Sequence, residues 1–159
     1  MIHPIITARR IMASRWDMIL PVDVSSIAAQ LGISVCFVSM DDDRVSAIAR
    51  VKNRKREILI NHNVEMHRVC FSIAHAMYHL LDSGDRDSEF VDYAENYSAV
   101  IADPDEKAAN TFASRIIAPE HAVKILVQRR GVTNVNELAI AFNCAPVLVN
   151  NVIQGMRWG

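Results

Sequence analysis

The sequence predicts an α+β fold, in which a small antiparallel three-stranded sheet packs on one long helix between flanking helices. Three strand-like stretches follow one another over residues 33–40, 45–51 and 56–62, and short charged turns separate them. Strands that follow so closely favour an antiparallel meander. The next segment, residues 64–82, has the apolar character of a long helix.

Further helices are predicted before this centre. Residues 5–19 carry a loose apolar stripe, and the stretch DVSSIAAQLGI reads as a short helix. Asp23 or Ser25 would cap that short helix, and Gly32 would end it. Asn63 is the expected cap of the long helix.

More helices are predicted after the centre. The polar stretch SGDRDSEFVDYAENYSAVIADP is expected to be a long surface connection. Asp103 and the proline after it begin a helix, Pro119 begins another, and NVNELAIAF and PVLVNNVIQ form two short ones. No repeat or linker divides the chain, so residues 1–159 are expected to form a single domain that includes the C-terminal helices 134–154.

Charge and composition exclude several classes of partner. The net charge of -1 gives no general attraction to nucleic acid or anionic membranes. The last two helices superficially resemble a helix-turn-helix, but the second lacks Lys and Arg, so we expect core-forming or partner-docking helices.

Cys36, Cys70 and Cys144 lie among apolar neighbours and are expected to be buried thiols. Without a signal peptide or membrane span, a cytoplasmic location is expected.

The stretch FSIAHAMYHLL points to a metal site. His75 and His79 are four residues apart, so both imidazoles lie on one helix face and can bind one ion. Zinc prefers such ligands, but two histidines alone are also compatible with ordinary hydrogen-bonded or exposed side chains. Glu106 is the candidate third ligand and Asp105 its nearest rival. A capping box with Asp103 would equally explain Glu106.

Four blocks together resemble the ImmA/IrrE family of zincin-like metallopeptidases. They are IAAQLGI, ILIN, CFSIAHAMYHLL and EKAANTFASRIIAP, in the order and spacing of that family, and they cover most of the chain from about Pro21. The resemblance implies that His75, His79 and Glu106 hold zinc. It also implies a protein substrate or partner, such as a helix-turn-helix repressor or an antitoxin, in a phage, mobile-element or toxin–antitoxin context.

The chain departs from the family pattern at Ala76, where the family has the glutamate that acts as general base. Without a positioned base hydrolysis should lose a factor of about 10²–10⁴, while metal binding should largely survive. The usual glycine before the second histidine is Tyr78, a packed tyrosine or a cleft residue. His121 is a further candidate for the cleft.

Three functions are therefore considered. The first is a zinc-dependent peptidase, inactive as written because alanine replaced its glutamate, and the intact family blocks favour it. The second is a natural pseudo-peptidase that binds and sequesters a repressor or antitoxin without cleavage. The third is a structural protein without metal.

Overall fold

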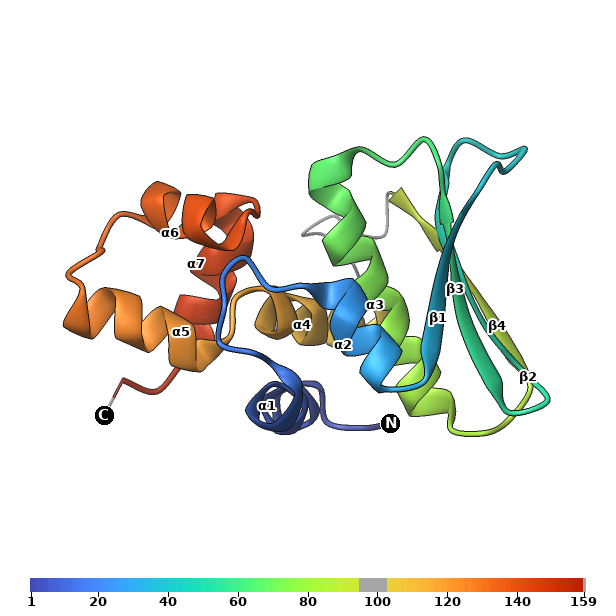
Figure 1. The fold of residues 1–159 in the computed structure, drawn as a ribbon, viewed down its shortest axis with the longest axis horizontal. Helices are drawn as coiled ribbons and strands as arrows, with labels where there is room; N and C mark the ends of the chain where they lie inside the picture. The colour runs from blue at the N-terminus through green and yellow to red at the C-terminus, as the bar shows by residue number, and fades with distance from the viewer. Residues whose placement is uncertain (95–102, 159) are drawn as a thin grey trace.

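The computed structural model describes residues 1–94 and 103–158, and its helices cover one face of a sheet (Figure 1). The helices are α1 (Pro4–Arg15), α2 (Val24–Gln30), α3 (Met66–Ser83), α4 (Pro104–Ile117), α5 (Glu120–Lys124), α6 (Val135–Phe142) and α7 (Pro146–Gly155), and the π-helical segment η2 (Ile125–Arg129) continues α5. The strands are β1 (Ile33–Val38), β2 (Val45–Lys52), β3 (Lys55–Asn61) and β4 (Ser88–Tyr93). The α+β class predicted from the sequence is confirmed.

The sheet is mixed, and within the described residues it has four strands in the order β1-β3-β2-β4. The prediction of a three-stranded antiparallel sheet is therefore wrong in the number of strands and in the direction of β1. Asn53 and Arg54 adopt φ values of 52° and 65°, which build a tight hairpin between β2 and β3. With one edge of β3 taken by β2, β1 occupies the other edge and runs parallel to β3.

The fourth strand corrects the predicted surface connection after α3. Residues Ser88–Tyr93 form β4 and pair antiparallel with β2, whereas residues 95–102 lie outside the described part of the chain. Phe90 and Asp92 point to the helical face of the sheet, while Val91 is exposed on the other. This alternation is the period of a half-buried strand.

The long helix α3 lies between the sheet and α4 (Figure 1). It begins after Glu65 instead of the predicted Asn63, whose side-chain amide donates to the backbone carbonyl of Asp43. Gly84, at φ 65°, ends it as predicted. All side chains of residues 72–80 are buried, because neighbouring elements cover the helix on several sides.

A continuous group of buried hydrophobic residues extends from α1 to Met156, just beyond α7. Arg115 of α4 is also buried, and its Nε donates to Glu120 at 3.0 Å. α7 ends directly against this side chain, since a methyl group added to Gly155 would collide with the Arg115 guanidinium.

Two further observations concern the surface. The prediction of buried cysteines is wrong: Cys36 is exposed on β1, and Cys70 and Cys144 are only partly buried. Within the described residues, no single helix has the length and apolar character needed to cross a membrane. The pair α6 and α7, bent by 106°, satisfies that criterion only when both helices are counted together.

Candidate metal centre

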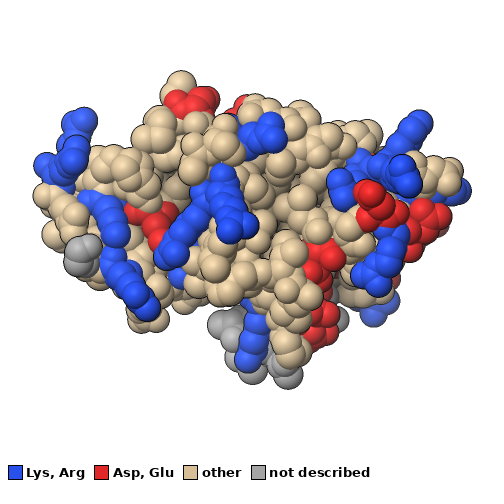
Figure 2. Space-filling model, turned by 90° about the horizontal axis from the view of Figure 1, so that it is seen from below, with Lys and Arg blue, Asp and Glu red and all other residues tan. Residues whose placement is uncertain are grey.

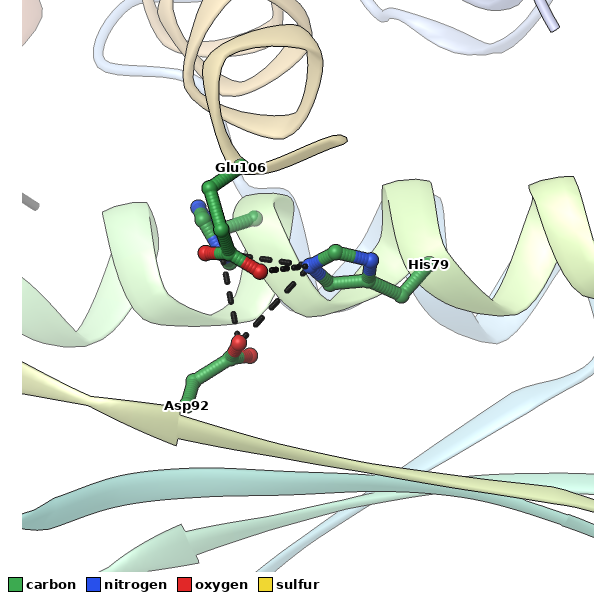
Figure 3. Close-up of side chains that lie close together, drawn as sticks. His79, Asp92 and Glu106 are labelled. Atoms are coloured by element: carbon green, nitrogen blue, oxygen red, sulfur yellow. Dashed lines mark hydrogen bonds and ion pairs between the residues drawn. The ribbon is translucent and has the colours of Figure 1, made fainter. Parts of the chain in front are cut away.

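Four side chains from three elements converge on one point between the sheet and α4. His75 and His79 come from α3, Asp92 from β4 and Glu106 from the first turn of α4. One ligand atom from each lies within 4.8 Å of the others. Figure 3 shows Glu106 reaching toward α3 from one side and Asp92 from the other.

The two histidines present the same ring nitrogen to this point. Their Nε2 atoms are 3.3 Å apart, as expected for residues one helical turn apart on a single face. Both side chains are buried, at 0% and 5% exposure. The ring of His79 stacks on Phe90 with centroids 5.0 Å apart, which fixes its orientation.

Glu106 is directed at the histidines and not at its own helix cap. Its Oε2 lies 2.9 Å from Nε2 of His75, and its Oε1 lies 3.1 Å from Nε2 of His79. Asp103 caps α4 instead, because its carboxylate accepts a hydrogen bond from the N–H of Asp105 at 2.8 Å. Asp105 itself is exposed and stays outside the group of four.

Asp92 was missed by sequence reasoning, since a lone acid in a polar stretch carries no ligand spacing. Its side chain is 1% exposed, and its Oδ1 lies 3.3 Å from Nε2 of His75 and 3.7 Å from Nε2 of His79. β2 has one extra residue opposite it, because Val45 pairs with Tyr93 and Ala47 with Asp92. Such a bulge re-aims side chains and often occurs beside functional sites.

Asn110, one helical turn beyond Glu106, fixes the other side of the His75 ring. Its Oδ1 lies 2.7 Å from Nδ1 of His75. A side-chain carbonyl can only accept, so Nδ1 carries the proton and the neutral ring keeps the Nε2 lone pair for a ligand. Asn110, which belongs to the sequence block EKAANTFASRIIAP, therefore supports the site by orienting the His75 imidazole.

The electrostatics of the metal-free group are those of a buried ion cluster. Burial alone would lower the pKa of His75, but the carboxylates of Asp92 and Glu106 outweigh it and raise that pKa to about 9. Burial likewise would raise the pKa of Glu106, yet His75 and His79 hold it down to about 2. In the absence of a cation, a proton on His75 supplies the positive charge.

The residues present fit a zinc ion. Two nitrogens and two carboxylates are ligands that zinc accepts, and ligands about 2.0 Å from a tetrahedral centre stand roughly 3.3 Å from one another. The distances between the ligand atoms given above, 2.9 to 3.7 Å, lie around that value. In addition, the buried Asp92 carboxylate accepts no well-formed hydrogen bond from the described residues and faces the two imidazoles, so a cation between them would balance its charge.

The remaining candidate residues are placed elsewhere. Ala76 is completely buried on α3 and has no group that can take up a proton. Tyr78 is fully buried too, packs on Phe112, and donates from its hydroxyl to the backbone carbonyl of Ile2 at 3.2 Å. Burial raises the pKa of Tyr78 to about 12, so the phenol stays protonated.

His121 is exposed on α5 and lines a cavity of about 520 Å³ between α1 and α5, apart from the metal-binding group. Arg9 and Lys124 share this cavity with the apolar side chains of Met12 and Trp16. Figure 2, a view from the side of α1, shows Lys and Arg side chains spread over this face with acidic side chains between them.

Comparison with known proteins agrees with this geometry. The family model described as the IrrE N-terminal-like domain, a peptidase family, matches residues 28–151. A search of curated proteins found no match. The matched region covers most of the chain and contains all four side chains of the candidate metal centre. The chain therefore belongs to the IrrE N-terminal-like peptidase family, as its four sequence blocks predicted.

Proposed function

We propose that this chain binds zinc through His75, His79 and Glu106, and that it engages a regulatory protein, such as a helix-turn-helix repressor or an antitoxin. The observation that carries the proposal is the convergence of the two imidazoles and the Glu106 carboxylate. Their nearest nitrogen and oxygen atoms are 2.9 to 3.3 Å apart, about the separation of two ligands on one zinc ion. A bound zinc ion would supply a Lewis acid at this point. The regulatory partner and its phage, mobile-element or toxin–antitoxin context are part of this proposal, and they rest on the resemblance of the four sequence blocks to the ImmA/IrrE family.

The chain as printed should hold its partner without cleaving it. Peptide hydrolysis needs a group that takes a proton and hands it to the leaving amine, and Ala76 supplies none at the position next to His75. Asn110 does not supply this group either, because its Oδ1 is already hydrogen-bonded to Nδ1 of His75, whose ring it orients. The peptidase that lost its glutamate and the natural pseudo-peptidase therefore behave alike here. They differ in whether Ala76→Glu restores cleavage of the partner.

Metal analysis tests the zinc site. Purified protein should contain stoichiometric zinc, and His75→Ala or His79→Ala should remove it. His67→Ala is the matched control, because His67 lies on the same helix but has a 65% exposed side chain outside the cluster. Zinc content that is equal in all four proteins would exclude the site.

Co-expression tests the partner. The protein should be produced together with the repressor or antitoxin encoded beside its gene, and the pair should co-purify with the partner at full length. Cleavage by Ala76→Glu would support an active parent enzyme, and binding without cleavage would support the natural pseudo-peptidase. A partner that neither co-purifies nor changes its DNA binding would contradict the proposed recognition.

A further inference from the structure

We infer that Asp92 occupies the fourth coordination position, the one that a hydrolytic zinc site keeps for water, so that four protein side chains enclose the metal. The inference rests on the zinc site proposed above and specifies its chemistry. A site with three protein ligands and an open position is catalytic, whereas a site closed by four protein ligands is structural.

The burial of Asp92 is the first argument. Removing a carboxylate from water without a partner costs several kcal/mol, so such groups are normally paired or bound to a metal. Asp92 is 1% exposed, neither of its oxygens accepts a well-formed hydrogen bond from the described residues, and its Oδ1 faces only the imidazoles of His75 and His79, at 3.3 and 3.7 Å. A cation between Asp92 and the histidines would balance this charge.

The position of Asp92 is the second argument. Its Oδ1 is 3.3 Å from Nε2 of His75, the same separation as between the two histidine nitrogens. That is about one edge of a tetrahedron around zinc. A carboxylate that served a bound water would stand one hydrogen bond further out, roughly 2.7 Å beyond the water oxygen. The oxygen of Asp92 thus lies where the fourth ligand belongs.

A closed site has a consequence for hydrolysis. Ala76 already supplies no proton-transfer group, and a coordinated Asp92 would also occupy the position of the attacking water. The closed site consequently favours the natural pseudo-peptidase over an enzyme that only lost its glutamate. It also implies that Ala76→Glu alone leaves the coordination closed.

Cobalt(II) substitution tests the inference without an activity assay. Four-coordinate cobalt absorbs far more strongly in the visible range than five- or six-coordinate cobalt, and its spectrum changes when azide or hydroxide enters an open position. The unsubstituted protein should give an intense spectrum that neither azide nor a rise of pH through neutrality alters. Asp92→Ala should make the spectrum sensitive to both and should weaken zinc binding by at least about 10- to 100-fold.

Two variants serve as controls. Glu89→Ala removes an acid from the opposite face of β4, where Glu89 pairs with Arg50, and should leave the spectrum unchanged. Ala76→Glu should also keep the azide-insensitive spectrum. If Asp92→Ala does not fold, Asp92→Asn keeps the side-chain shape, and its cobalt spectrum should likewise become sensitive to azide.

The outcomes separate the two proposals. An azide-sensitive spectrum of the unsubstituted protein would overturn the closed site and leave the three-ligand zinc site standing. Failure to take up cobalt or zinc at all would overturn both. An azide-insensitive spectrum that persists in Asp92→Ala would show that Asp92 is no ligand, and would overturn the inference alone.

Discussion

At the scale of single residues, Asn110 decides which nitrogen of His75 would be available to the proposed metal. Its Oδ1 lies 2.7 Å from Nδ1 of His75 and accepts a hydrogen bond from it, which keeps the proton on Nδ1. Asn110→Ala removes this acceptor and should lower zinc affinity about 10- to 100-fold, because partners of ligating histidines commonly contribute that much. A competition titration against a chelating dye measures the change.

Asn110→Asp provides the matched control, since it keeps an acceptor oxygen at the same place and should retain most of the affinity. If both variants bound zinc as tightly as the unsubstituted chain, the tautomer argument would be wrong.

The ionisation of His75 and Glu106 predicts the pH dependence of the metal-free protein. The His75 pKa is raised from 6.5 to about 9, so its contribution is complete below pH 6.5 and is lost as the pH rises toward 9. The Glu106 pKa is lowered from 4.5 to about 2, so its contribution is complete above pH 4.5 and is lost as the pH falls toward 2. Stability should therefore be greatest between pH 4.5 and 6.5.

Urea unfolding in the presence of a chelator measures this profile. Each flank should fall by on the order of 3 kcal/mol, since one pKa unit corresponds to about 1.4 kcal/mol. His75→Gln should flatten the alkaline flank. An alkaline flank that persists in His75→Gln would assign the effect to other groups.

At the scale of elements, the cap of α4 positions Glu106, one of the proposed metal ligands. The Asp103 carboxylate accepts from the N–H of Asp105, and Glu106 follows in the same first turn. Asp103→Ala should cost about 1 kcal/mol of stability and weaken zinc binding by up to about fivefold.

Asp23→Ala removes the equivalent cap of α2, where the carboxylate accepts from the N–H of Ser26 at 3.0 Å. It should lower stability to a similar extent and leave zinc affinity unchanged. Calorimetric titration of both variants distinguishes a local effect on Glu106 from general loosening; equal losses of affinity would point to the latter.

The elements also show where prediction from the sequence ends. The HxxxH helix could be found from its apolar periodicity and ligand spacing, and the helix of Glu106 from its Asp103 cap, because these are local signals. The direction of β1 could not, because it depends on which edge of β3 remains open after the β2–β3 hairpin forms. Asp92 was missed for a related reason: only pairing with β2 places it opposite the histidines.

At the scale of the whole molecule, the proposed metal would connect the sheet to two helices. The side chains that could hold it come from α3, β4 and α4, so an ion that binds only the folded chain would stabilise all three together. At a free zinc concentration 1,000 times the dissociation constant, the gain is about 4 kcal/mol. For a chain of this size that corresponds to a rise in Tm of roughly 8–16 °C.

Thermal unfolding with zinc and with chelator measures this rise. His79→Ala should abolish it, whereas His62→Ala, on an exposed residue just after β3, should retain it. A zinc-dependent shift that survives in His79→Ala would place the ion elsewhere.

The contact between the end of α7 and Arg115 has a consequence for how this protein can change over generations. Glycine at 155 leaves room for a guanidinium that a methyl group would strike, and that guanidinium is paired with Glu120. A bulkier residue at 155 would push the end of the Arg115 side chain aside, and its cost depends on whether the guanidinium can move without losing Glu120. The effects of substitutions at positions 115 and 155, forty residues apart, on stability should therefore be non-additive.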